Sequence, residues 1–483
     1  MGNENSLKSK TLSGLLFKTL ERVGTQGISL AISIILARLM SPEDYGNVNL
    51  ILVFVTLFDI IINYGFGSAL IQKKDPDSLD FSSCMYASLA ITAVIYVAMF
   101  FASPLIASFF GNAALSLMLR VVGIRVIFAG INSIQYAYIA KNFLFRKTFL
   151  ATIISTLISG ALGIVMAYYG AKEWALIAQS LASSVILVIV LAISLKMEIT
   201  FRFSFDRIKQ IFSLGSRLML IGILNSVYSE LRSIIIGKKY TTADLAFYDK
   251  GRNLPKLASN NINAIIDGVM FSTLSKVQDD KKEMVSILSR SIRTAMFALC
   301  PMLVGLALVS DNLIMVLYTE TWMEAAFYLK IFCISFLTMP VITMNLNAIK
   351  AAGKGNLALG INVATVVISV ASLIVSMLFG VRWIAVSNIF VNVIQTLIYM
   401  WYANKLFGYR FAAQFKDMFF DLVPTVIMGV CVFGAGFIGL PTIAVLLIQI
   451  AVGAGVFLAA SILTKNSSYT YLLATIKNKV KKA

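Results

Sequence analysis

Six polar side chains recur on one face of a segment that is otherwise apolar. They are Asp249, Arg252, Lys256, Asn260, Asn263 and Asp267, and they follow one another at spacings of 3, 4, 4, 3 and 4 residues. Successive helical residues turn by about 100°, so all six fall within roughly 80° of one helix face. Charged groups in hydrocarbon cost several kcal/mol each, which means that this face must point to protein or water. Its guanidinium and ammonium groups suit phosphate and carboxylate anions.

Similar polar faces occur on three other apolar segments. Segment 14–37 carries Lys18, Arg22, Gln26, Ser29 and Ser33. Segment 212–236 carries Arg217, Asn225, Tyr228 and Arg232, and segment 46–71 carries Asn49, Thr56, Asp59 and Asn63. Basic residues outnumber acidic ones within these segments, which favours an anionic substrate over a lipophilic cation. The candidate substrate-binding residues are Arg22, Arg217, Arg252, Lys256, Gln26, Asn260 and Asn263.

Intramembrane carboxylates are the groups that could bind a coupling ion. The candidates are Asp59, Asp267, Asp249 and Glu230, and the ion would be H⁺ or Na⁺. The chain has no P-loop to use ATP, and no cofactor is expected. It has no histidine, and its cysteines are scattered singly, so no metal site is expected. The alternative for each carboxylate is a structural pair with a nearby arginine.

Some of these charges have a simpler explanation. Lys18, Arg22 and Arg217 lie near the inner ends of their segments, where long side chains can reach the interface. The same snorkelling accounts for Arg290 and Arg293.

Composition defines the class of protein. The chain of 483 residues is 59% hydrophobic and 13% charged, with a mean hydropathy of +0.85. Soluble domains carry about a quarter charged residues, so this is an all-α polytopic membrane protein. The net charge of +18 does not indicate nucleic-acid binding, because the basic residues lie mainly in short loops rather than in one patch.

Stretches of about 20 apolar residues, long enough to cross a bilayer, give about fourteen predicted spans. They are 14–37, 46–71, 82–109, 115–139, 148–169, 174–195, 212–236, 245–274, 288–310, 322–349, 356–379, 383–405, 418–438 and 442–463. Alternate loops carry most of the Lys and Arg, and the positive-inside rule then places both termini in the cytoplasm.

The chain also repeats itself. Residues 37–46 (ARLMSPEDYG) precede residues 237–246 (GKKYTTADLA) by 200 positions, and both segments join the first two spans of a set of six. The sequence thus predicts two parallel six-helix lobes, at 1–195 and 211–406, joined by a cytoplasmic linker at 196–210. Residues 407–483 supply two further helices and a basic cytoplasmic tail.

The motif at 37–46, followed by GFGSALIQ at 65–72, resembles bacterial polysaccharide flippases of the multidrug/oligosaccharidyl-lipid/polysaccharide exporter superfamily. The resemblance covers essentially the whole chain. It implies alternating-access flipping of undecaprenyl-pyrophosphate-linked sugar units from the cytoplasmic to the outer leaflet of the inner membrane. These are the O-antigen, capsule and colanic-acid type transporters. The resemblance implies that the chain contacts membrane lipid and acts together with a polysaccharide polymerase and chain-length machinery.

Two alternatives stay open. A multidrug exporter of the same superfamily is disfavoured by the basic cavity. A membrane polysaccharide polymerase or glycosyltransferase would need a catalytic loop, and the predicted outside loops are short, so we expect no enzyme activity.

Overall fold

The computed structural model describes residues 2–62, 66–209, 211, 230–420 and 422–480. These residues form helices joined by turns and short loops, with no strand among them, which confirms the predicted all-α class. The chain divides into two units, Met1–Ala246 and Phe247–Ala483. The boundary between them falls inside α10 (Thr242–Lys276).

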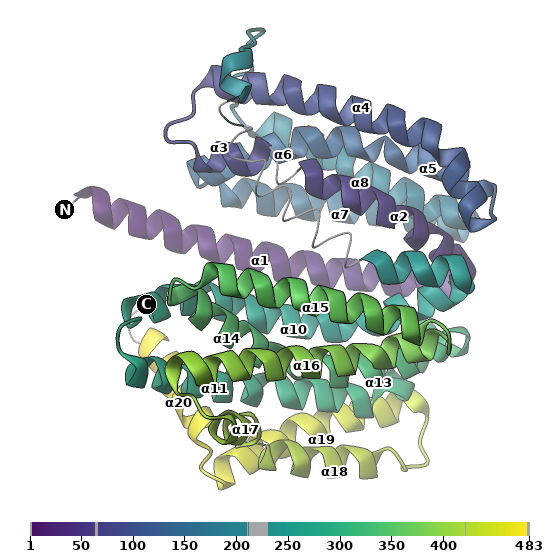
Figure 1. The fold of residues 1–483 in the computed structure, drawn as a ribbon. Coiled ribbons are helices and arrows are strands. Elements are labelled where there is room, and N and C mark those ends of the chain that lie inside the picture. Colours follow the sequence, from purple (N-terminus) through teal and green to yellow (C-terminus); the bar gives the residue numbers. More distant parts are fainter. Residues whose placement is uncertain (1, 63–65, 210, 212–229, 421, 481–483) are drawn as a thin grey trace. The chain divides into compact units, whose positions relative to one another are not determined.

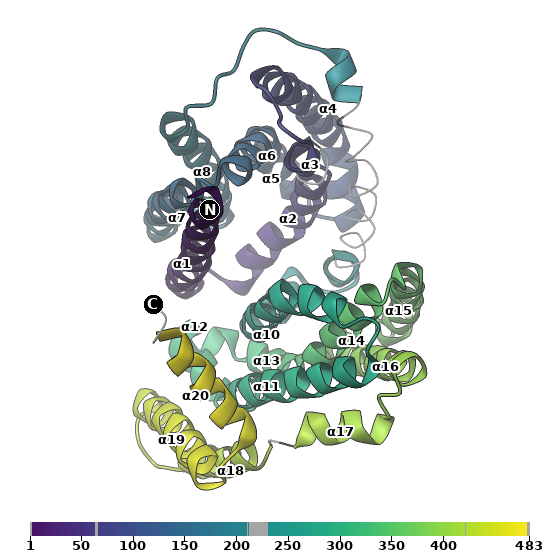
Figure 2. The ribbon, with the colours of Figure 1, turned by 90° about the vertical axis from the view of Figure 1, so that its left-hand side faces the viewer.

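Among its described residues, the first unit contains the start of α10, the helical stretches 205–209 and 230–239, and eight complete labelled helices. They are α1 (Gly2–Leu39), α2 (Pro42–Ile62), α3 (Ser68–Gln72), α4 (Ser78–Phe110), α5 (Ala114–Gly123), α6 (Arg125–Asn142), α7 (Phe145–Tyr168) and α8 (Glu173–Ser194). In this unit α1 lies along α7, and α7 lies beside α8 (Figures 1 and 2). Helices α4 and α6 pack together, and α2 contacts both α6 and α8.

The second unit contains most of α10 and ten helices after it. They are α11 (Lys281–Leu308), α12 (Ser310–Tyr318), α13 (Glu324–Phe336), α14 (Met339–Ala351), α15 (Gly355–Ser376), α16 (Val381–Phe407), α17 (Phe411–Phe419), α18 (Val423–Ala435), α19 (Thr442–Leu463) and α20 (Ser467–Val480). Helix α11 occupies the middle of this unit, where it contacts α13, α14, α17, α18 and α20. Helices α18 and α19 form an antiparallel pair (Figure 2).

Length and hydropathy identify the helices that can cross a membrane. In the described part of the chain 10 helices meet both criteria, and α17 with α18, bent by 43°, bring the number to 11. The protein is therefore a multi-pass membrane protein. The other predicted spans are 46–71 and 212–236, which include residues outside the described part, and 245–274, which carries the polar face of α10.

The internal repeat corresponds to a repeated helix start. At α2 the Ser41 hydroxyl accepts from Asp44 N, and the Asp44 carboxylate accepts from Ser41 N, each at 3.2 Å. At α10 Thr241 and Asp244 exchange the same two bonds, each at 3.1 Å. Such reciprocal caps satisfy backbone donors that a helix start leaves unpaired. The two sequence copies thus encode the same local structure.

The segment that follows α8 packs along the N-terminal turns of α4. Thr200 N donates to Ser82 Oγ at 2.9 Å, and Ser204 N donates to Ser83 Oγ at 3.1 Å. Arg207 then donates to the buried Asp80 carboxylate at 3.0 Å. The predicted linker at 196–210 therefore has, over its described residues, defined partners in the first unit.

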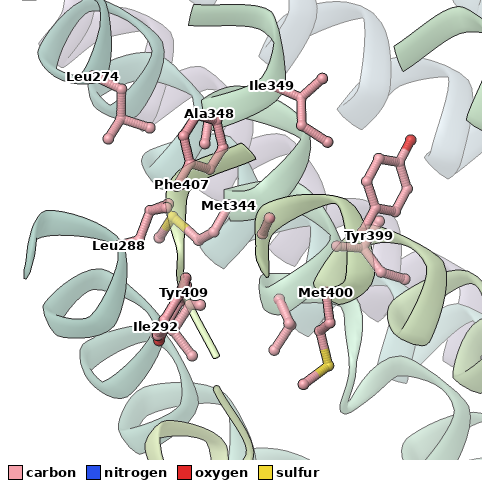
Figure 3. Packing of buried hydrophobic residues seen from close by; sticks show 14 of the residues in the cluster. Leu274, Leu288, Ile292, Met344, Ala348, Ile349, Tyr399, Met400, Phe407 and Tyr409 are labelled. Atoms are coloured by element: carbon pink, nitrogen blue, oxygen red, sulfur yellow. The ribbon is translucent and has the colours of Figure 1, made fainter. Parts of the chain in front are cut away.

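The largest part of the hydrophobic core in the second unit lies between α11, α14 and α16. Figure 3 shows Leu288 and Ile292 from α11 facing Met344 from α14, with Met400 from α16 close by. All of these side chains are at most 1% exposed. This core holds the helices behind α10 in a fixed position, so the polar face of α10 is built on a rigid support.

Candidate functional site

Helix α10 carries the predicted polar face, and its sequence explains how it is positioned. The cap at Thr241 and Asp244 starts the helix, which continues through Pro255 to Lys276. At Gly251 a side chain would meet Ala325 O and Tyr328 Cβ at 2.6 Å, so only glycine allows α10 to pack this closely against α13. This contact covers one side of α10 and leaves the polar face away from it.

Arg252 is the half-buried cation of that face. Among the described residues it forms no salt bridge with any carboxylate. One and two turns further along, Lys256 and Asn260 are exposed. A partly desolvated guanidinium without an ion-pair partner is suited to bind a phosphate or carboxylate with two parallel hydrogen bonds.

The other half of the face carries amides and a carboxylate. Asn347 on α14 donates to Asp267 Oδ1 at 2.7 Å, and no basic side chain of the described chain forms a salt bridge with Asp267. Asn263 donates to Ser259 Oγ at 3.2 Å, while its own Oδ1 is buried and accepts no hydrogen bond from a described residue. Because a buried amide oxygen is costly to leave unsatisfied, Asn263 Oδ1 marks a position for a hydrogen-bond donor.

Lys250 is a buried cation that the sequence did not single out as a site residue. It is 6% exposed, and its ammonium lies 5.0 Å from the Tyr318 ring and 5.4 Å from the Trp322 ring. Its neighbour Asp249 is half-buried. Cation–π contacts of this kind stabilise a desolvated lysine, so we interpret Lys250 as part of the structure that fixes the start of the polar face.

In the first unit the predicted residues are dispersed over several helices. Arg22 is exposed on α1, and Gln26 is partly buried one turn later. Glu21 faces α7, where Thr152 donates to its carboxylate at 3.2 Å. Glu230 is partly buried at the start of the described helical stretch 230–239. Arg217 lies outside the described residues.

Asp59 is paired with an arginine. Arg125 Nη2 lies 3.0 Å from Asp59 Oδ2, and Arg125 Nη1 donates to Ser180 Oγ at 3.1 Å. For Asp59 the structure therefore shows the ion pair that was the alternative to a coupling role. Asp267 differs, because its described partner is the neutral amide of Asn347.

A polar cavity of about 310 Å³ lies beside this ion pair in the first unit. Arg125 and groups from α1, α2, α7 and α8 line it, including Ser29, Asn49, Thr156, Ser159, Gln179, Ser180, Ser183 and Ser184. The sequence analysis identified Ser29 and Asn49 as polar, but it missed the α8 contribution. The available signal was Gln179 to Ser184, which places several hydroxyls at helical spacing within an apolar helix.

Each unit thus brings some predicted residues together. The second unit places Asp249, Arg252, Lys256, Asn260, Asn263 and Asp267 along one helix, as predicted. The first unit gathers Asp59, Arg125 and a hydroxyl-rich cavity. The roles of these residues in binding and coupling stay predictions.

Comparison with known proteins identifies the chain's relatives. The family described as "Polysaccharide biosynthesis protein" matches residues 35–327. The chain is 23% identical over 340 residues to the succinoglycan biosynthesis transport protein ExoT of Rhizobium meliloti, covering 70% of this chain and 69% of that relative.

Solved structures show the same fold. The lipid II flippase MurJ matches with a TM-score of 0.72 and 16% identity, over 94% of this chain and 99% of that one. A multidrug resistance MATE family transporter of the MOP superfamily matches with a TM-score of 0.62 and 15% identity, over 80% and 98%. The prediction of a membrane transporter rather than an enzyme is confirmed by these relationships. The chain belongs to the family of polysaccharide biosynthesis proteins.

Proposed function

We propose that this chain flips an undecaprenyl-pyrophosphate-linked oligosaccharide from the cytoplasmic to the outer leaflet of the bacterial inner membrane. The observation that carries the proposal is Arg252, a half-buried cation that forms no salt bridge among the described residues. It lies on a helix face with a lysine and two amides on one side of it along the helix, and with Asp249 and Asp267 at the ends of the face. An anionic head group with attached sugars has the chemistry that this face can bind.

The proposed architecture has fourteen spans. Two parallel six-helix lobes (1–195 and 211–406) are joined by the linker 196–210, and 407–483 add two helices and a tail, with both termini in the cytoplasm. The ten or eleven membrane-capable helices of the described chain support this arrangement. So do the equivalent caps that begin α2 and α10. Alternating access of the two lobes would expose the substrate to each leaflet in turn.

Each group on the polar faces has a proposed role. Arg252, with Lys256, Arg22 and Arg217, binds the pyrophosphate or acidic sugars. Asn260, Asn263 and Gln26 hydrogen-bond sugar hydroxyls, and the buried Oδ1 of Asn263 supports this role because it needs a donor. A sugar hydroxyl can supply that donor.

The proposed driving force is an H⁺ or Na⁺ gradient acting on carboxylates. Asp267 is the leading coupling group because its described partner is neutral, and Asp59, Asp249 and Glu230 are the further candidates. The product would be used by a polysaccharide polymerase and its chain-length machinery at the outer face.

Reconstituted vesicles can test the proposal. Purified protein would be placed in liposomes that contain a fluorescent lipid-linked oligosaccharide in both leaflets, and a membrane-impermeant reagent would report the labelled sugar at the outer surface. We expect protein-dependent movement between leaflets that Arg252→Ala slows about 10- to 100-fold. The proposal would be contradicted if correctly folded protein moved none of several lipid-linked oligosaccharides that differ in their sugars.

The multidrug alternative predicts a different result in the same vesicles. An exporter of lipophilic cations would expel a cationic dye under an ion gradient. The MATE fold is compatible with this activity, but Arg252, which forms no salt bridge among the described residues, would repel a cationic substrate. Dye export without oligosaccharide movement would favour the multidrug exporter.

A further inference from the structure

Away from the polar face of α10, α11 and α20 border an open polar pocket of about 380 Å³. From α11, Arg290 and Arg293 line it together with Ser286 and Ser289. From α20, Ser468 and Tyr471 complete the wall. Two guanidinium groups surrounded by hydroxyl donors form an environment that suits a phosphate group.

The two arginines differ in their partners. Arg293 Nε donates to Asp417 Oδ1 at 2.7 Å, and Tyr409 donates its hydroxyl to Asp417 Oδ2 at 2.5 Å. Burial and the Asp417 carboxylate raise the pKa of Tyr409, so its phenol stays protonated and keeps donating. The Asp417 carboxylate therefore neutralises Arg293 and holds it in place.

Arg290 supplies the excess positive charge. Its guanidinium carbon lies 5.9 Å from the centre of the Tyr471 ring, and among the described residues it has no salt bridge. The backbone N–H groups of Ser468 and Tyr469 at the start of α20 are already bonded to Asn466 Oδ1. The charge of Arg290, rather than the helix start, thus makes this pocket attractive to an anion.

A second, apolar groove of about 560 Å³ lies further along α11. It is lined by Phe297, Pro301 and Gly305 of α11, Met428 of α18, and Gly453 and Phe457 of α19. The α11 positions 290, 293, 297, 301 and 305 follow at spacings of 3, 4, 4 and 4. They fall within roughly 120° of one helix face, so the arginines and the groove share that face.

Helices α19 and α20, which line the groove and the polar pocket respectively, are consecutive in the chain. Phe457 contacts Phe297 in a tilted arrangement with ring centres 5.1 Å apart, and a short turn joins α19 to α20, which lines the polar pocket. The polar pocket and the apolar groove thus follow one another along the axis of α11. That order of surfaces matches a lipid with a charged head group and an acyl chain.

We propose that the pocket between α11 and α20 binds the phosphodiester head group of an anionic glycerophospholipid, with one acyl chain lying in the groove between α11, α18 and α19. Arg290 and Arg293 contact the phosphate, and the serine and tyrosine hydroxyls donate to its oxygens or to the glycerol. In the orientation that the loop charges predict, this end of α11 lies at the cytoplasmic leaflet. Anionic lipids give that leaflet a negative surface potential.

Native mass spectrometry of the full chain can test the site. The protein would be titrated with dioleoyl phosphatidylglycerol, with dioleoyl phosphatidylcholine, with undecaprenyl phosphate and with inorganic phosphate. Bound adducts and the melting temperature would be measured. We expect phosphatidylglycerol to bind and raise the melting temperature, with phosphatidylcholine binding about fivefold more weakly, the effect of one basic contact at a membrane surface. Equal stabilisation by phosphate alone, or tighter binding of undecaprenyl phosphate than of phosphatidylglycerol, would overturn the proposal.

Two matched pairs of variants locate the binding. Arg290→Gln should weaken phosphatidylglycerol binding about fivefold, and Lys282→Gln, an exposed cation on the same helix, should not. Gly305→Leu should exclude the chain from the groove, because a Cβ there meets only Met428 Cε at 3.9 Å and leaves the backbone undisturbed. Gly360→Leu, with no atom within 4 Å of its Cβ, is the control. Unchanged lipid binding in both Arg290→Gln and Gly305→Leu proteins that melt normally would refute the site.

Discussion

Asp59 on α2 and Arg125 on α6 form an ion pair of 3.0 Å whose arginine also donates to Ser180 on α8. One guanidinium thereby connects three helices of the first unit. The Asp59 side chain is 18% exposed and that of Arg125 is 30% exposed, so the pair is only partly screened by solvent. A coupling ion at Asp59 would have to compete with Arg125, whereas at Asp267 it would meet a neutral amide.

Removing one member of this pair should destabilise the protein. Asp59→Asn leaves a partly buried Arg125 without its counter-charge, and we expect a loss of about 1–3 kcal/mol, below the 3–5 kcal/mol of a fully buried pair. Arg125→Gln should cost a similar amount, while the double variant should cost less than the sum. Thermal unfolding in detergent measures these effects, with Asp75→Asn, an exposed loop carboxylate, as the control. Additive losses would show that the two side chains do not interact.

Asp267 offers a test of coupling that is separate from stability. Asp267→Asn keeps an acceptor for the Asn347 amide, so we expect nearly normal abundance and melting temperature. If the carboxylate binds the coupling ion, the variant should transport without dependence on the pH or Na⁺ gradient, or stop transporting. The measurement is the flipping rate in vesicles under imposed gradients. A rate whose gradient dependence matches the unmodified protein would remove Asp267 as the coupling group.

Arg252 should matter to transport more than to folding. Arg252→Ala deletes a cation that has no ion-pair partner among the described residues, so little stability depends on it. Loss of a charged hydrogen bond to substrate should lower flipping about 10- to 100-fold. Arg252→Lys keeps the charge without the bidentate geometry, so its flipping rate should lie between those of the unmodified protein and of Arg252→Ala. Quantitative membrane immunoblotting checks abundance, and Lys281→Ala on α11 is the control. A loss of protein rather than of transport would instead indicate a structural role.

Local patterns in the sequence predicted much of this structure. The 3.6-residue periodicity identified the polar face of α10, and the repeated segments 37–46 and 237–246 both proved to be capped helix starts. These features depend on residues only a few positions apart, and such short-range relations can be read directly from the chain.

Long-range partners could not be predicted in the same way. Arg293 and Asp417 are 124 residues apart, and Arg125 and Asp59 are 66 apart. Only the fold determines which side chains meet. The α8 hydroxyls were missed because a serine in an apolar helix commonly bonds to its own backbone, as Ser184 does with Ser180 O at 3.4 Å. Their second role, lining a cavity, appears only when the other helices are in place.

Gly46 provides the last test, because the first unit leaves no room for a side chain there. A Cβ at this position would lie 1.8 Å from Thr242 O, so the start of α2 and the start of α10 meet with backbone in contact. Backbone cannot move aside as a flexible side chain can, and Gly46→Ala should therefore cost about 1–3 kcal/mol or more through overpacking. We expect a lower melting temperature and reduced transport, measured on purified protein and in vesicles. Gly27→Ala on α1, where no atom lies within 4 Å of the added Cβ, should change neither quantity. If Gly46→Ala also melted and transported normally, the close approach of these two helix starts would be contradicted.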